Sequence, residues 1–179
     1  GSDWVLLDEA TISGSAAQFH FTSAGSDDAW SNYRSLMCIG SLRNSNGGDM
    51  VWRFGSYSGG YAWTRADSTG SPIYTGSYTG WEGRSDGVNT WSGETAGFFS
   101  PFKMLLVDHN DYTLPVGWNV HASTSVTSTG RMNRNMGNWN PATRVAITEI
   151  YLISGNNNPA TQNFEVGSMA QVFGLKEPA

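Results

Sequence analysis

The chain ends in the stretch NFEVGSMAQVFGLKEPA (residues 163–179), which directly follows the polar run SGNNNPATQ (154–162). Phe164 and Val166 alternate with Glu165 until Gly167-Ser168 interrupts the pattern, and residues 169–175 then resume the alternation. A period of two is typical of a β-strand, and a glycine inside such a pattern marks a kink. A disordered tail does not show such an alternation of apolar and polar residues. The sequence therefore predicts a kinked strand that closes the core at the end of the chain.

The composition favours a single all-β domain. A chain of 179 residues has the length of one β-sandwich, and its 22 glycines supply many turns. Charged residues make up only 14 % of the chain, well below the usual quarter, and the formal net charge is −5. Because a nucleic-acid interface needs a basic stripe, no nucleic-acid partner is expected. We interpret residues 1–179 as one β-sandwich domain.

The single cysteine and the hydropathy pattern indicate the setting in which the chain folds. Cys38 lies within SLMCIG (35–40), so it is interpreted as a small buried hydrophobic residue, and one cysteine cannot form an internal disulfide. The sequence shows neither a signal peptide nor the run of roughly 20 apolar residues that a membrane span needs. We expect no membrane partner and folding in a reducing cytoplasm. Gly1-Ser2 is either a cloning scar or a native start.

Short segments of period-two or continuously apolar character recur along the chain, and about ten strands are expected. In AQFHFT (17–22) the two phenylalanines face away from His20, and in MVWRFGSY (50–57) Trp52 faces away from Arg53. The Asn-Gly-Gly of RNSNGGD (43–49) predicts a hairpin, so these strands are expected to form a meander. The two last strands, from AITEIYLISG (146–155) and FEVGSMAQVFGL (164–175), are expected to be adjacent and antiparallel. The predicted fold is an antiparallel β-sandwich of jelly-roll type.

The segment Gly59–Thr90 has a different character, because it is rich in Gly, Ser and Tyr and its apolar residues are mostly aromatic. Two strands are expected, in YAWTRA (61–66) and PIYTGSY (72–78). Tyrosine and tryptophan combine a rigid apolar face with a polar group and are favoured at interfaces. The candidate contact residues in and beside this segment are Tyr57, Tyr61, Trp63, Tyr74, Tyr78 and Trp81. The alternative is that about half of them fill the core.

No combination of residues predicts catalysis, a metal or a cofactor. The densest polar cluster, VDHNDY (107–112), lacks the ligand spacing of a calcium loop and is interpreted as a turn. His20 and His121 occupy polar-facing strand positions. Two carboxylates can cleave a glycosidic bond, and the acids near the aromatic segment are Glu82, Asp86 and Glu94, but nothing places a pair of them at a catalytic distance. We expect no catalytic residues, no metal site and no cofactor.

The order of these segments resembles a family of β-sandwich structural proteins of tailed bacteriophages. Such sequences open with a Trp and an apolar pair before a Thr/Ser-rich strand, here WVLLDEATISGSAAQFHFT (4–22). NYRSLMCIGSL (32–42) and MVWRFGS (50–56) follow, and the ending Phe-x-x-Gly-Ser with aromatic-Gly-Leu matches residues 147–175. Each piece is only a strand signature, so the order and spacing carry the likeness, which is weakest between Gly59 and Thr90. The long GWEGRSDG loop (80–87) departs from the pattern, as does Phe173 where the family often has Tyr.

The resemblance implies a virion component without catalytic residues to carry over. Three classes are open: a non-enzymatic decoration or cement protein bound to capsid subunits, a tail-tip or fibre domain that binds a receptor or a host-surface glycan, and a glycan-cleaving enzyme. Decoration is preferred because the first strand begins at Trp4, which leaves no shaft or coiled-coil segment. A decoration protein at a three-fold capsid site commonly matches that symmetry, so a homotrimer at the virion surface, made in the host cytoplasm, is expected.

Overall fold

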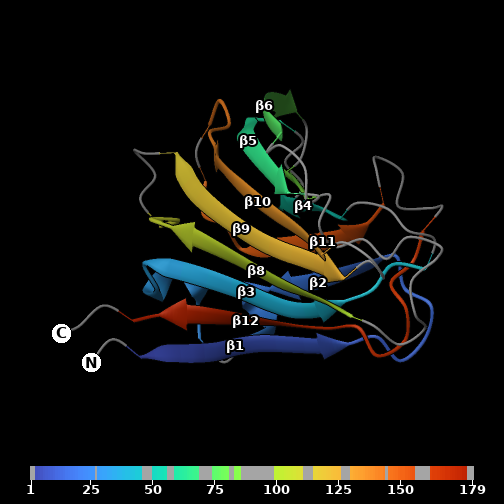
Figure 1. Cartoon of the computed structure of the whole chain (residues 1–179). Coiled ribbons are helices and arrows are strands. Elements are labelled where there is room, and N and C mark those ends of the chain that lie inside the picture. The colour runs from blue at the N-terminus through green and yellow to red at the C-terminus, as the bar shows by residue number, and fades with distance from the viewer. Residues whose placement is uncertain are drawn as a thin grey trace.

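The computed structural model describes residues 3–26, 28–45, 50–55, 59–68, 74–80, 83–85, 99–110, 115–125, 130–143, 145–155 and 162–176. These residues form twelve strands in two antiparallel sheets, with two single-turn 3₁₀ helices at Ser23–Gly25 and Trp30–Asn32. In Figure 1 the large sheet faces the viewer and the small sheet lies behind it. The predicted antiparallel β-sandwich is confirmed, with two more strands than the approximate count from the sequence.

The large sheet contains eight strands. In spatial order they are β1 (Trp4–Thr11), β12 (Met169–Leu175), β3 (Ser35–Leu42), β8 (Ser100–Val107), β9 (Val116–Ser125), β10 (Gly130–Trp139), β5 (Tyr61–Ser68) and β6 (Tyr74–Gly80). The small sheet has the order β2 (Gln18–Thr22), β11 (Glu149–Ser154), β4 (Met50–Phe54) and β7 (Gly83–Ser85). Every pairing in both sheets is antiparallel.

Eight of the strands follow the jelly-roll path. Taken in chain order, β1, β2, β3, β4, β7, β8, β11 and β12 switch between the large and the small sheet at every step except from β4 to β7, which both belong to the small sheet. Numbered one to eight, they give the sheet orders 1-8-3-6 and 2-7-4-5, which is the arrangement of two Greek keys wound into a sandwich. The first and last strands therefore pair, and β12 lies between β1 and β3. The C-terminal stretch closes the large sheet, as its alternation predicts, whereas β1 is an edge strand.

Two hairpins are inserted into this path and widen the large sheet. β5 and β6 lie between the fourth and fifth jelly-roll strands in the chain, and β9 and β10 lie between the sixth and seventh. β10 pairs with β5, so the two insertions form one continuous four-stranded extension beside β8. The strands expected in 61–66 and 72–78 correspond to β5 and β6, and β6 is the edge strand of the extension (Figure 1).

Three corrections to the sequence interpretation concern which strands pair. β2, β3 and β4 do not form a meander, because β3 belongs to the large sheet and the other two to the small sheet. The predicted hairpin between β3 and β4 is likewise not formed, and the last two strands, β11 and β12, lie in different sheets. The physical reason is shared: a turn signal such as Asn-Gly-Gly marks where the chain reverses. It does not determine whether the next strand pairs with the last one or crosses to the facing sheet.

The side-chain alternation within strands was predicted correctly. Phe19 and Phe21 of β2 are buried while His20 is exposed, and Met50, Trp52 and Phe54 of β4 are buried between the sheets. Aromatic rings fill the space between the small sheet and the insertion. The Phe54 and Trp139 ring centroids are 5.6 Å apart at 71°, and those of Trp52 and Trp118 are 5.9 Å apart at 87°. Such edge-to-face contacts add to the hydrophobic effect of burying these rings.

The Phe-x-x-Gly-Ser segment forms a structural corner. Phe164 is buried against Phe19, with ring centroids 5.0 Å apart. Gly167 has φ 92°, a left-handed conformation that favours glycine. The buried Ser168 Oγ accepts a hydrogen bond from the Arg43 N–H at 3.1 Å and donates to the Arg43 carbonyl at 3.3 Å. The kink predicted at Gly167-Ser168 is thus the place where the chain crosses from Phe164 to β12 and is joined to the end of β3.

The expectation for the single cysteine can be compared with the described residues. Cys38 is buried in β3, and burial raises the pKa of its thiol well above the usual range, as expected for a core residue. None of the helices among the described residues is long and apolar enough to cross a membrane.

Candidate interaction surface

Most of the aromatic residues proposed as a contact surface cannot be placed as side chains. Tyr57 and Trp81 lie outside the described residues. Trp63 belongs to β5, and Tyr74 and Tyr78 belong to β6, but only their backbone is described. In the strand register Trp63 lies between Gly137 of β10 and Tyr78 of β6. A contact role for these residues stays a prediction.

Tyr61 is the exception, because it lies in the core with 2 % of its surface exposed. Its hydroxyl accepts a hydrogen bond from the backbone N–H of Phe54 at 2.8 Å, and the two ring centroids are 5.8 Å apart. The hydroxyl thereby satisfies a buried donor of β4 from the facing sheet. Tyr61 is therefore one of the aromatic residues that fill the core and is not part of a contact surface.

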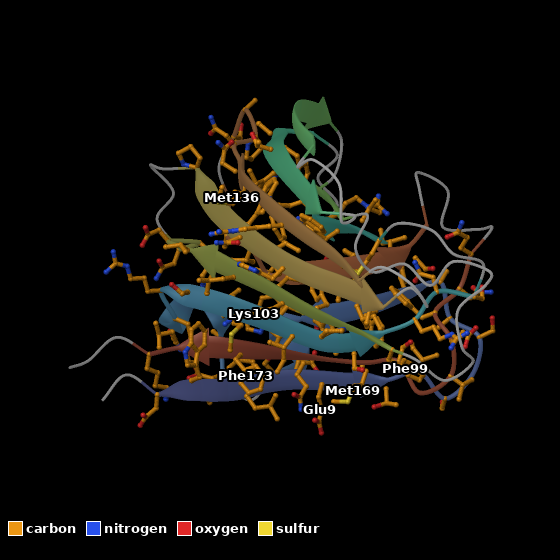
Figure 2. All side chains as sticks on the ribbon, in the orientation of Figure 1. Glu9, Phe99, Lys103, Met136, Met169 and Phe173 are labelled. Atoms are coloured by element: carbon orange, nitrogen blue, oxygen red, sulfur yellow. The ribbon has the colours of Figure 1, made fainter. Side chains whose placement is uncertain are left out.

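The outer face of the large sheet carries a continuous row of apolar side chains. The strand register places these residues side by side across six strands, and we call them the apolar row: Leu6, Phe173, Met37, Leu105, Asn119 and Met136. Asn119 is its only polar member. Phe173 and Met136 are labelled in Figure 2, on β12 and β10 respectively. Leu6 and Met136, at the two ends of the row, are 46 % and 49 % exposed, while Phe173, Met37 and Leu105 are half-buried.

Further exposed apolar side chains extend this patch. Trp4 of β1 and Val107 of β8 are both exposed, and Leu175 of β12 pairs with Trp4 in the strand register. Scattered exposed apolar residues are ordinary, but a contiguous apolar patch on a soluble domain marks a contact surface. The outer face of the large sheet is therefore the strongest candidate for an interaction surface among the described residues.

A second row on the same face is polar and asymmetric in charge. We call it the charged row, and its members in strand order are Glu9, Gln171, Ile39, Lys103, His121 and Arg134. Gln171 Nε2 donates to Glu9 Oε2 at 3.0 Å. Lys103, His121 and Arg134 are direct cross-strand neighbours, and neither Lys103 nor Arg134 forms an ion pair with another described residue. Partial burial lowers the pKa of His121, and the positive charges of Arg134 and Lys103 lower it further.

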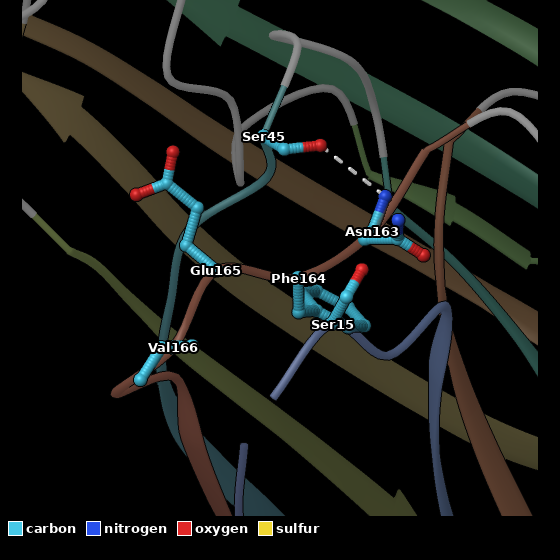
Figure 3. Close-up of a pocket in the computed structure, with 6 residues that line it drawn as sticks. All are labelled: Ser15, Ser45, Asn163, Phe164, Glu165 and Val166. Atoms are coloured by element: carbon cyan, nitrogen blue, oxygen red, sulfur yellow. Dashed lines mark hydrogen bonds between the residues drawn. The ribbon is translucent and has the colours of Figure 1, made fainter. Parts of the chain in front are cut away.

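A shallow hollow of about 380 Å³ lies beside the C-terminal corner (Figure 3). Its lining residues are Ser15, Ser45, Asn163, Phe164, Glu165 and Val166. The Asn163 N–H donates to Ser45 Oγ at 3.4 Å, and Glu165 Oε2 lies 2.8 Å from Arg43 Nε. The single carboxylate of the hollow is therefore paired, and no second acid or base among the lining residues stands ready for proton transfer.

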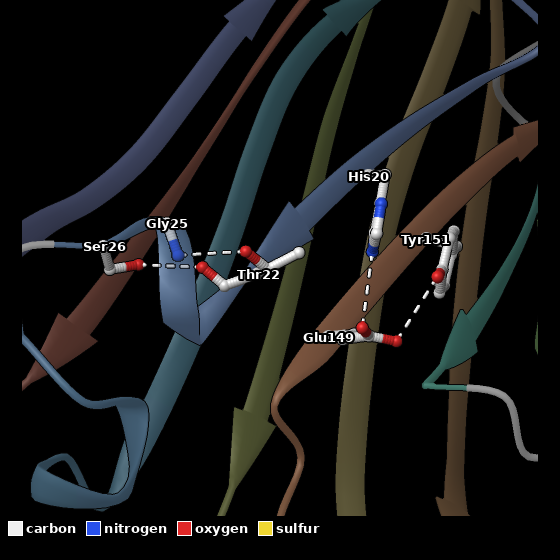
Figure 4. Close-up of polar contacts among 6 residues, drawn as sticks. All are labelled: His20, Thr22, Gly25, Ser26, Glu149 and Tyr151. Atoms are coloured by element: carbon white, nitrogen blue, oxygen red, sulfur yellow. Dashed lines mark hydrogen bonds and ion pairs between the residues drawn. The ribbon is translucent and has the colours of Figure 1, made fainter.

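The outer face of the small sheet carries a compact polar group (Figure 4). The rings of His20 and Tyr151 are stacked at 4.1 Å and 8° on neighbouring strands β2 and β11. Glu149 Oε1 lies 3.7 Å from His20 Nε2, and the Tyr151 hydroxyl donates to Glu149 Oε2 at 3.3 Å. Burial and the neighbouring Glu149 carboxylate raise the pKa of Tyr151. The arrangement offers a flat aromatic surface with hydrogen-bonding groups at its edge.

The residues considered for catalysis or metal binding do not form a reactive site in the described part of the chain. Asp108 has a positive φ of 53° and starts the turn after β8, and its Oδ1 lies 2.7 Å from Arg34 Nε. This agrees with the turn interpretation of VDHNDY. Among the described residues, no three His, Cys, Asp or Glu side chains come close enough to hold a metal ion. Glu82, Asp86 and Glu94 lie outside the described residues.

The apolar row could not be predicted from the sequence, because alternation alone does not show which face of each strand points inward. In residues 169–175 the larger apolar side chains point outward, and Ala170, Val172 and Gly174 face the core. Gln171, which shares a face with Phe173, is the signal that this face is at least partly open to solvent. In β10 the buried Trp139 shows which face points inward. Gly137 shares that face, so its neighbour Met136 lies on the outer face.

Comparison of the chain with protein-family models, with curated proteins and with solved structures finds no significant match.

Proposed function

We infer that this chain is a non-enzymatic structural protein of a tailed bacteriophage, located on the surface of the virion, and that it acts as a capsid decoration protein. The observation that carries this proposal is the outer face of the large sheet. It presents an apolar row across six strands on a jelly-roll sandwich, and the hollow found among the described residues holds a single carboxylate that is paired with Arg43. Broad apolar faces of this kind serve association between proteins.

The fold and the sequence resemblance support the same class. Jelly rolls occur in viral capsid and lectin domains. The order of strand signatures resembles phage virion proteins, and the Phe-x-x-Gly-Ser part of that likeness corresponds to the corner at Gly167 and Ser168. A decoration protein of this design associates with copies of itself through the outer face and reaches capsid subunits through the aromatic segment 59–90. Binding to assembled capsid stabilises the shell by mass action.

The second candidate is a tail-tip or fibre domain that binds a receptor or a host-surface glycan. The stacked His20 and Tyr151 rings favour it, because a flat aromatic surface with Glu149 at its edge suits the apolar face and the hydroxyls of a sugar. This candidate uses the opposite face of the sandwich from the apolar row.

Co-sedimentation with capsids assembled without this protein tests the decoration function. We expect saturable binding and a higher temperature of shell disruption in the presence of the protein. The matched control is the double variant His20→Ala, Tyr151→Ala, which should bind capsids as the wild type does. A wild-type protein that fails to bind such capsids, but binds host polysaccharide and loses that binding in the double variant, would replace the proposal with the second candidate.

A further inference from the structure

The apolar row and the charged row are arranged in a self-complementary way about the boundary between β3 and β8. Three strands, β1, β12 and β3, lie on one side of this boundary, and β8, β9 and β10 lie on the other. The most exposed apolar side chains of the two rows, Leu6 and Met136, stand at the two outer positions. In the charged row an acid, Glu9, stands at one outer position and a base, Arg134, at the other.

We propose that a second copy of this chain covers this face, related to the first by a two-fold axis that runs parallel to the strands between β3 and β8. The proposal rests on the proposed function in that both have copies of this chain associate through the outer face, and it names the symmetry of that association. A rotation about such an axis keeps every residue in its own row and reverses the order of the strands. β1 of one copy then lies over β10 of the other, β12 over β9, and β3 over β8. The resulting interface is closed and uses the same patch twice.

In the apolar row this rotation brings the exposed ends together. Leu6 of one copy lies over Met136 of the other, and Met37 lies over Leu105. Because the contact occurs twice, both exposed apolar ends of each copy are covered. Methionine has a flexible, polarisable side chain that fills irregular gaps, so Met37 and Met136 suit a surface that must match itself.

In the charged row the rotation pairs opposite charges. Glu9 of one copy lies over Arg134 of the other, beside His121 and Lys103. Within one chain these two residues cannot pair, because five strand spacings of ~4.8 Å place them roughly 24 Å apart. Lys103 and Arg134 disfavour a positive charge on His121 in the isolated chain, and their charges add to partial burial in lowering the pKa of His121. The second copy supplies the carboxylate that this cluster lacks among its described neighbours.

The shape of the sheet is compatible with this contact. The twist of a β-sheet gives its face the shape of a saddle. A two-fold rotation about an axis parallel to the strands keeps the hand of this twist, so the outer faces of the two copies follow the same curvature and can pack against each other. Six strands over about 20 Å of length give roughly 600 Å² of flat area per copy. The total of roughly 1,200 Å² lies at the lower bound for specific stable interfaces, so a dimer of micromolar affinity is expected. This dimer takes the place of the homotrimer expected from capsid symmetry.

Charge reversal tests the two-fold arrangement directly. Glu9→Arg places two positive residues opposite each other at both ends of the dimer, and Arg134→Glu places two negative residues there. Each variant alone should dissociate at a concentration at least about tenfold higher than the wild type in sedimentation velocity. An equimolar mixture of the two variants should regain wild-type association, because both Arg–Glu pairs form again in the mixed dimer. Rescue in the mixture also shows that both variants are folded.

Glu149→Arg, a reversal on the outer face of the small sheet, is the matched control and should dimerise as the wild type does. A wild type that stays monomeric through the micromolar range, a trimer, or a mixture that fails to associate while both variants keep the wild-type melting temperature would overturn the proposal. Capsid binding separates the two proposals. A monomer that binds capsids overturns the dimer and the self-association through the outer face but not the capsid contact, and a dimer that does not bind capsids overturns the decoration function alone.

Discussion

The ring of Tyr33 lies directly against the backbone of Gly174, so that a Cβ atom at position 174 would overlap the ring carbons. Tyr33 is fully buried, and its hydroxyl donates to Asp28 Oδ2 at 3.0 Å, which holds the ring in place. This hydrogen bond, after the one from Asn32, lowers the pKa of Asp28. The glycine of the aromatic-Gly-Leu ending therefore lets β12 pass close beneath the segment that precedes β3.

Gly174→Ala is expected to destabilise the protein by about 1–3 kcal/mol, the usual cost of overpacking a core. Gly117→Ala is the matched control, because it also lies in a strand of the large sheet and a Cβ there meets no atom within 4 Å. Urea unfolding of both variants checks the difference. Equal stability of the two variants would contradict the close contact between Tyr33 and Gly174.

The buried hydroxyl of Tyr61 predicts a second difference between matched variants. Tyr61→Phe leaves the N–H of Phe54 without its acceptor inside the core, which is expected to cost about 1–3 kcal/mol. Tyr151→Phe removes a hydroxyl that bonds to Glu149 at the partly exposed outer face, so its effect should be within about 0.5 kcal/mol. Thermal unfolding of the two variants measures both values, and a neutral Tyr61→Phe would show that the hydrogen bond contributes nothing.

His121 should titrate below its ordinary pKa of 6.5, because partial burial and the charges of Arg134 and Lys103 all favour the neutral imidazole. The folded state then disfavours protonation of His121 relative to the unfolded state. Its contribution to stability is greatest above pH 6.5 and is lost as the pH falls through the lower pKa of the folded state.

An NMR titration of the His121 ring at dilute, monomeric concentration should show the pKa rising in Arg134→Gln and unchanged in Arg53→Gln, which alters the small sheet. An unchanged pKa in Arg134→Gln would exclude the repulsion.

The local pattern of the sequence predicted strands well, because alternation is a property of neighbouring residues. Phe19, Phe21, Trp52 and Phe54 point inward as their spacing indicates, and the Gly167-Ser168 break is a real corner. Which strands pair could not be obtained in this way. Pairing in a jelly roll joins β1 to β12 across almost the whole chain, and no local signal records that choice.

The candidate surface was less predictable for a related physical reason. When a strand has large apolar side chains on one face and small ones on the other, the simplest prediction is that the large ones face the core. In β12 the facing Tyr33 ring leaves room only for Gly174, so Phe173 is turned outward. The basic cluster of Lys103, His121 and Arg134 was likewise invisible, because these residues come from three strands and become neighbours only through the register.

The aromatic segment gives the last prediction. Tyr78 lies on β6, the edge strand of the insertion, and Trp81 follows that strand in the sequence. Edge strands are places where another protein can be bound, and Tyr and Trp are enriched at the energetic centres of interfaces. We expect the double variant Tyr78→Ala, Trp81→Ala to weaken capsid binding at least about tenfold while its melting temperature stays close to that of the wild type.

Tyr61→Ala is the control for a core aromatic residue in the same segment, because it removes a buried ring and should lower the melting temperature sharply. Capsid co-sedimentation and thermal unfolding, measured on the same samples, separate the two effects. A double variant that loses stability as Tyr61→Ala does, but binds capsids normally when folded, would show that Tyr78 and Trp81 belong to the core and that the capsid contact lies elsewhere.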